Sequence, residues 1–136
     1  MQSNVKITII TVTYNSEGSI EKAIKSVLAQ SILQKVSGQS GQEDPEHVQL
    51  EYLIIDGASK DATVARAESY SSAFTQAGVQ YKIVSEPDKG IYDAMNKGIR
   101  LAAGDIIGIL NSDDWYEPDT LETVLDTFCQ NSCDLM

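Results

Sequence analysis

The sequence IIGILNSDD, residues 106–114, runs from an apolar stretch into two adjacent carboxylates, Asp113 and Asp114. A strand that ends in this way places acidic groups at the carboxyl edge of a sheet, where open α/β folds bind ligands. Two neighbouring carboxylates repel each other, so the site favours a hard divalent cation such as Mg²⁺ or Mn²⁺, which prefers oxygen ligands. Substrate phosphates commonly fill the open positions on such a cation. The segment therefore predicts a metal–diphosphate site, and the alternative is an acidic turn before a helix beginning near Pro118.

Alternating strands and helices extend on the amino-terminal side of this segment. Apolar runs rich in Ile, Val and Thr are typical of buried parallel strands, and the residues after each run have helical spacing. The expected strands are Lys6–Thr13, Tyr52–Ile55, Tyr81–Val84 and Ile106–Leu110. The expected helices run from about Ile20, with Ser19 as N-cap, over Val64–Phe74, capped by Asp61, over Ile91–Ala102 and over Leu121–Phe128. This order predicts an α/β fold with a mainly parallel sheet and helices on both faces.

The size and composition of the chain predict a single domain and argue against several classes of protein. The 136 residues, 42% of them hydrophobic, predict one domain over residues 1–136, with a flexible polar loop at 37–46. A formal net charge of -10 argues against a nucleic-acid partner. The sequence has no membrane span of the roughly 20 apolar residues required and no signal-peptide pattern, which favours the cytoplasm. Cys129 and Cys133 have no second pair and no nearby histidine to build a zinc site.

Polar side chains follow the end of each expected strand. They are Thr13, Tyr14 and Asn15, then Asp56, then Asp88 and Lys89, and finally Asp113 and Asp114. Because the carboxyl ends of parallel strands meet at one edge of a sheet, these residues can converge although they lie far apart in sequence. The pattern predicts a nucleotide-type site. The alternative is that polar residues occupy the loops of any such fold.

Five segments together resemble family 2 glycosyltransferases with the GT-A fold. They are IITVTYN (9–15), SVLAQ (26–30), IDGASKDAT (55–63), SEPDKGIYDAMNKG (85–98) and NSDD (111–114). The match runs in order from about Val5 to Phe128, and the variant is similar to bacterial enzymes of surface-polysaccharide and lipopolysaccharide assembly. The resemblance implies a fold like that of nucleotide-diphospho-sugar transferases.

The resemblance also implies roles for single residues at a nucleotide-sugar site. The backbone around Val12 and the ring of Tyr14 would border the base. Asp56 would accept a hydrogen bond from the base, most often from uracil N3–H, which a fixed acceptor can select. Lys89 lies near a basic position that reaches the diphosphate, and Asn96 matches the family asparagine of the third helix.

The segment Asn111–Asp113 stands at the family Asp-x-Asp motif. The resemblance implies that Asp113 is a metal ligand, with Asp114 beside it, and that the cofactor is Mg²⁺ or Mn²⁺. Asn111 replaces the first aspartate, so it can bind a ribose hydroxyl but supplies less charge to the metal. Met95 stands where many relatives have an arginine, which removes one phosphate contact.

Family chemistry implies transfer of a sugar from a nucleoside-diphosphate donor, first of all a UDP-sugar, to a hydroxyl of a saccharide or lipid-linked acceptor, with inversion. The expected location is cytoplasmic, including the inner face of the membrane. The family's general base lies beyond the segments quoted above, so no catalytic residue is assigned. We expect a donor-binding half, truncated before the acceptor-binding half and slow in transfer by itself.

Two other classes of protein remain open from the sequence. One is a non-catalytic nucleotide-binding module. The other is a different phosphate enzyme, such as a nucleotidyltransferase or a dinucleotide-dependent oxidoreductase. The segment after the first strand lacks G-x-G-x-x-G, and the chain has no G-x-x-x-x-G-K-[ST], so the dinucleotide and P-loop alternatives are less favoured.

Overall fold

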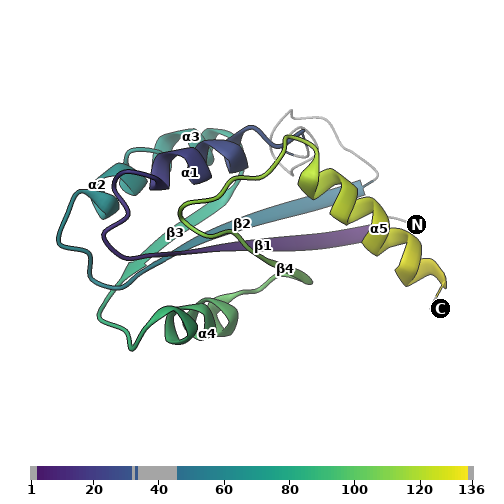
Figure 1. The fold of residues 1–136 in the computed structure, drawn as a ribbon. Coiled ribbons are helices and arrows are strands. Elements are labelled where there is room, and N and C mark those ends of the chain that lie inside the picture. The colour runs from purple at the N-terminus through teal and green to yellow at the C-terminus, as the bar shows by residue number, and fades with distance from the viewer. Residues whose placement is uncertain (1–2, 32, 34–45, 135–136) are drawn as a thin grey trace.

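The computed structural model describes residues 3–31, 33 and 46–134, which form a sheet covered by helices on both faces (Figure 1). The sheet has four strands in the order β3-β2-β1-β4, and each neighbouring pair is parallel. The strands are β1 (Ser3–Thr13), β2 (Glu46–Asp56), β3 (Gln80–Ser85) and β4 (Ile106–Ile109). The helices are α1 (Ile20–Leu28), α2 (Thr63–Glu68), α3 (Ser71–Gln76), α4 (Ile91–Leu101) and α5 (Thr120–Asp134). The α/β fold expected from the sequence is confirmed.

The alternation of side chains along β1 and β2 builds a separate core on each face of the sheet. On one face, Ile7 and Ile9 of β1 pack in a cluster that includes buried residues of α1, α2, α3 and α5. On the other face, Ile10 and Val12 pack in a second cluster with Ala94 of α4. Among the helices that the structure describes, α4 lies on the side of the sheet opposite α1, α2 and α3 (Figure 1).

Strand β2 is longer than the sequence predicted. It was expected over Tyr52–Ile55 but pairs with β1 along its whole length, from Glu46 to Asp56. The first half of β2 contains several polar residues, so it does not form the continuous apolar run from which a buried strand is predicted. One of them, Glu51, is buried, and its Oε1 accepts hydrogen bonds from Thr8 Oγ1 (2.9 Å) and from the backbone N–H of Ala103 (3.0 Å). The expected loop at 37–46 lies outside the described residues except for Glu46, which begins β2.

The helix expected over Val64–Phe74 is two short helices, α2 and α3. At the break, Ser69 Oγ donates to the carbonyl of Arg66 at 2.6 Å, a local bond that competes with helical pairing. The break lets Phe74 stack on Tyr81, with ring centroids 4.4 Å apart. No helix in the described part of the chain is long and apolar enough to span a bilayer.

Candidate functional site

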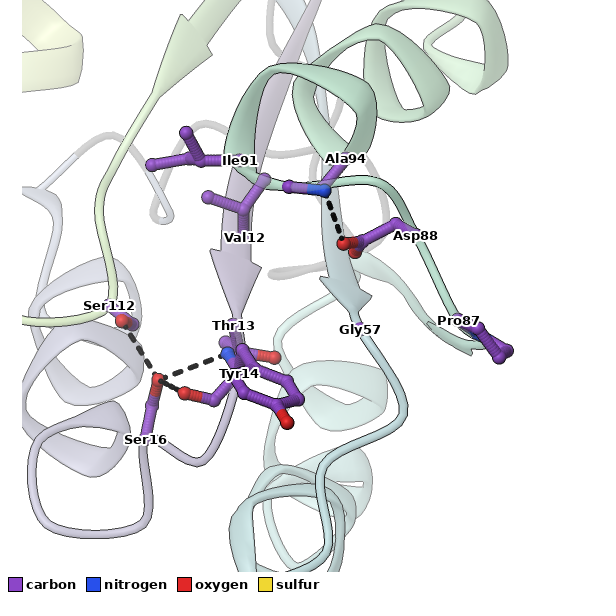
Figure 2. Close-up of a pocket in the computed structure, with 11 residues that line it drawn as sticks. Val12, Thr13, Tyr14, Ser16, Gly57, Pro87, Asp88, Ile91, Ala94 and Ser112 are labelled. Carbon is purple, nitrogen blue, oxygen red and sulfur yellow. Dashed lines mark hydrogen bonds between the residues drawn. The ribbon is translucent and has the colours of Figure 1, made fainter.

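A cavity of about 510 Å³ opens at the carboxyl end of the sheet (Figure 2). Because β2 and β3 lie on one side of β1 and β4 on the other, the strand order reverses at β1, and open α/β folds bind ligands at such a switch point. The cavity is lined by Val12, Thr13, Tyr14, Ser16, Gly57, Pro87, Asp88, Gly90, Ile91, Ala94 and Ser112. These residues come from the end of β1 and the loop after it, the residue after β2, the turn before α4, the first turn of α4 and the loop after β4.

Hydrogen bonds join the loop after β1 to the loop after β2. The backbone N–H of Asn15 donates to Ser59 Oγ at 2.7 Å, and Asn15 Oδ1 accepts from the backbone N–H of Lys60 at 2.9 Å. The backbone N–H of Ser16 donates to Thr63 Oγ1 at 2.7 Å. Asn15 has φ 49°, a left-handed conformation that asparagine tolerates better than most residues. The loop that carries Tyr14 is therefore fixed by its neighbours, and Tyr14, 60% exposed, lies at the cavity.

The loop after β4 is tied to the same cavity. Ser112 Oγ lies 3.1 Å from Ser16 Oγ, and both residues line the cavity (Figure 2). Next along the chain, Asp113 and Asp114 are exposed. Neither forms an ion pair within the residues that the structure describes, and Asp114 Oδ1 accepts a hydrogen bond from the backbone N–H of Trp115 at 2.9 Å. Two uncompensated carboxylates therefore follow directly after a residue that lines the cavity.

Gln30 holds the segment that follows these carboxylates, a role that the sequence did not reveal. Its side chain is buried, and Nε2 donates to the carbonyls of Ser26 (3.0 Å) and Glu117 (2.6 Å). Its Oε1 accepts from the backbone N–H of Leu121 in the first turn of α5, at 2.9 Å. Ser26 Oγ in turn accepts from the backbone N–H of Tyr116 at 3.1 Å. In the sequence, Gln30 is marked only as part of the segment SVLAQ (26–30), one of the five that carry the family resemblance.

Asp56 is buried under hydrogen bonds at the end of β2. Its Oδ1 accepts from Thr13 Oγ1 and Ser59 Oγ, both at 2.6 Å. Its Oδ2 accepts from the backbone N–H of Ser59 and from Ser85 Oγ, both at 2.8 Å. Burial would raise the pKa of Asp56, but the bonds from Ser59, Thr13 and Ser85 lower it below its ordinary value. This carboxylate stays ionised and joins the ends of β1, β2 and β3.

The structure brings only part of the expected site together. Val12 and Tyr14 line the cavity. Lys89 and Asn96 are exposed outside its lining, and so is Asn111, which precedes Ser112. The roles expected for Asp56, Lys89, Asn96, Asn111, Asp113 and Asp114 stay predictions. Asp88, one of the polar residues expected to converge at this edge, also lines the cavity, and so do Gly57, Ile91 and Ser16, for which no role was predicted.

A family model and several curated relatives all identify the chain as similar to glycosyltransferases. A family model described as Glycosyl transferase family 2 matches residues 8–136. An uncharacterized glycosyltransferase of Mycobacterium tuberculosis is 32% identical over 89% of the chain and 39% of its own length. A putative teichuronic acid biosynthesis glycosyltransferase of Bacillus subtilis is 30% identical over 93% of the chain and 43% of its own length. The chain thus spans about two fifths of the length of these relatives.

Solved structures share the fold. Staphylococcus aureus TarS 1-349 superposes with a TM-score of 0.70 at 20% identity, over 92% of this chain and 32% of that one. The mannosyltransferase PcManGT of Pyrobaculum calidifontis, solved in complex with GDP-Man and Mn²⁺, gives a TM-score of 0.65 at 27% identity, over 88% of this chain and 31% of that one. These likenesses agree with the parallel sheet and the helices on both faces.

Proposed function

Since this chain belongs to glycosyl transferase family 2, we propose that it binds a nucleoside-diphosphate sugar and serves transfer of the sugar, with inversion, to an acceptor hydroxyl. The observation that carries the proposal is the cavity at the switch point of the sheet, whose lining residue Ser112 directly precedes two carboxylates that form no ion pair with any described residue. In this arrangement Val12 and Tyr14 border the base, and the diphosphate extends toward Asp113 and Asp114. The acceptor site and the general base stay unassigned among residues 1–136.

The carboxylates of Asp113 and Asp114 fit a divalent cation. They are exposed hard oxygen donors, and a Mg²⁺ site needs only one or two carboxylates when substrate phosphates complete the coordination. When bound, Mg²⁺ or Mn²⁺ would offset the charge that develops on the departing nucleoside diphosphate. The likeness to PcManGT, whose structure holds GDP-Man and Mn²⁺, supports this assignment. Asn111 would reach a ribose hydroxyl.

The positive charge near the diphosphate would come from Lys89. It is exposed at the turn before α4, and its backbone N–H donates to Asp93 Oδ2 at 2.8 Å, which fixes the turn. Its ammonium group forms no ion pair with the described residues and could reach an anion. Asn96, on the second turn of α4, would lie on the same side of the site as Lys89, near the diphosphate. On an acidic chain, local cations and the metal must together attract an anionic donor.

The process that we propose is synthesis of cell-surface polysaccharide, on a saccharide or lipid-linked acceptor. A relative named for teichuronic acid biosynthesis and another named chondroitin synthase, from Escherichia coli, support it. The proposed location is the cytoplasm or the inner face of the membrane, which the resemblance to bacterial enzymes of surface-polysaccharide assembly supports. A UDP-sugar is the first donor to test.

Calorimetric titration with UDP, GDP and dTDP, each with Mn²⁺ and with a chelator, tests the proposal. We expect micromolar to millimolar binding of at least one nucleotide that weakens at least about tenfold in chelator. Titration with Mn²⁺ alone is the control for metal binding without nucleotide. Equal affinity with and without the cation would contradict the metal–diphosphate site, and the absence of binding by all three nucleotides would contradict the donor site.

A further inference from the structure

The carboxylate expected to recognise the base has no free acceptor position. An ionised carboxylate offers about four lone-pair sites, and Asp56 receives four hydrogen bonds from Thr13, Ser59 and Ser85. Asp56 as a whole residue is only 1% exposed to solvent. A base could bind Asp56 only by displacing one of these donors and leaving that donor unpaired.

The geometry of the strands also directs Asp56 away from the cavity. Successive side chains of a strand point to opposite faces. Asp56 bonds Thr13, which lies in the alternation of Ile7 and Ile9, on the face of α1. Thr13 also lines the cavity, but Asp56 does not, and the apolar wall of the cavity comes from Val12 and Ala94, which belong to the core on the face of α4. Asp56 therefore lies beneath the site as a structural link.

The position after Asp56 points to the other face and is a glycine. A Cβ built on Gly57 would lie 2.7 Å from Oδ2 of Asp88, closer than Cβ atoms approach other atoms in real structures. The missing side chain thus creates the space that the carboxylate of Asp88 occupies. At this edge of the sheet the carboxylate in the cavity comes from Asp88.

Asp88 is held by its turn and keeps one oxygen available. Its Oδ1 accepts from the backbone N–H of Gly90 at 3.0 Å (Figure 2). Lys97 also holds the turn in place. Its Nζ donates a hydrogen bond to the carbonyl of Pro87 at 3.0 Å and forms an ion pair with Oε1 of Glu86 at 3.1 Å. Within the part of the chain that the structure describes, Oδ2 of Asp88 accepts no hydrogen bond.

The surroundings of this oxygen suit the edge of a planar base. Val12, Ile91 and Ala94 contribute apolar surface to the same cavity that Asp88 lines (Figure 2). A fixed carboxylate accepts from an imino N–H, which uracil, thymine and guanine carry on their pairing edge. Cytosine and adenine present an unprotonated nitrogen there, which would face the carboxylate and repel it.

We propose that Asp88, and not Asp56, recognises the base of the bound nucleotide and selects bases that carry an imino N–H. The inference rests on the proposed function and adds the residue that determines its nucleotide specificity. Gly57 is required for this recognition because the absence of a side chain there leaves room for the Asp88 carboxylate in the cavity. Asp56 then acts as a positioning residue for the loops around the site.

Calorimetric titration of the 136-residue chain with UDP, GDP, CDP and ADP in Mn²⁺ tests the inference. The unmodified chain should prefer UDP or GDP over CDP and ADP. Asp88→Asn should reduce this preference by about tenfold or more, because a charge-assisted hydrogen bond is lost and the amide can donate to cytosine. Gly57→Ala should reduce it similarly without any change of charge, since the added methyl group displaces Asp88.

Two matched variants separate the possible outcomes. Asp126→Asn makes the same chemical change at an exposed position of α5, outside the cavity lining, and should keep the preference. Asp56→Asn should also keep it, in protein shown by circular dichroism to be folded. Preference retained in Asp88→Asn, or lost only in Asp56→Asn, would overturn the inference while leaving donor binding intact. Failure of the unmodified chain to bind any of the four nucleotides would instead refute the proposed function, on which this inference depends.

Discussion

Asp56→Asn tests the structural role of the buried carboxylate. The change keeps the size of the side chain but removes its charge and replaces one oxygen by an NH₂ group. If the amide nitrogen takes the place of Oδ1, the hydroxyls of Thr13 and Ser59 can rotate and accept from it. If it takes the place of Oδ2, the backbone N–H of Ser59 faces a donor. We therefore expect the first orientation.

The expected loss of stability follows from the four hydrogen bonds. A bond to a charged acceptor contributes roughly 1.5–3 kcal/mol and a neutral bond roughly 0.5–1.5 kcal/mol, so each bond weakens by about 1 kcal/mol. Because the bonds share one side chain and their hydroxyls can reorient, we expect a loss of about 2–4 kcal/mol in the free energy of unfolding. Urea denaturation followed by far-UV circular dichroism at pH 7 measures it.

Acid pH gives an independent check on the same carboxylate. The pKa of Asp56 is lowered in the folded state, so its contribution is fully present above the unfolded pKa of about 4. It is lost as the pH falls through the lower, folded pKa. The difference in unfolding free energy between the unmodified chain and Asp56→Asn should therefore be constant at neutral pH and shrink below about pH 4.

Asp105→Asn is the matched control for this experiment. Asp105 is an exposed carboxylate whose Oδ2 accepts one hydrogen bond, from the backbone N–H of Lys6 at 3.0 Å. We expect a loss below about 1 kcal/mol for it. A similar small loss for Asp56→Asn, or a difference that does not change with acid pH, would refute the reasoning that the buried carboxylate holds the three strand ends together.

Three further changes test other parts of the structure. Gln30→Leu should lower the free energy of unfolding by about 2–4 kcal/mol in urea denaturation, since the loop before α5 loses buried hydrogen bonds; exposed Gln49→Leu is the control, and equal losses would contradict this role. Gly98→Ala should cost about 1–3 kcal/mol, because its Cβ would lie 2.7 Å from Cγ2 and 3.0 Å from Cδ1 of Ile10; Ile10→Val, which removes Cδ1, should recover part of that loss. Asp113→Ala should abolish the effect of Mn²⁺ on nucleotide affinity in calorimetry and leave the circular dichroism unchanged, and a retained metal effect would show that Asp113 is not a ligand.

The first half of β2 and the break between α2 and α3 show where sequence patterns failed. Glu51 reads as a surface residue in the sequence, yet it is buried because Thr8 on the neighbouring strand and the backbone after α4 bind its carboxylate. The break at Ser69 depends on a side-chain bond that competes with the helix. Both features arise from specific polar partners, and hydrophobic periodicity carries no information about such partners.

Residue patterns along the chain were enough to predict the α/β class, the order of the strands and the edge of the sheet where polar residues gather. Apolar runs, helical spacing and residues at strand ends are local properties of the chain, so these features can be read without coordinates. Which carboxylate is available to a ligand depends instead on the folded arrangement. Asp56 and Asp88 both follow strands, but hydrogen bonds from three strand ends enclose the first, and the missing side chain of Gly57 admits the second to the cavity. Burial and acceptor saturation depend on residues brought together by folding, so the roles of the two aspartates could not be distinguished from their positions in the sequence.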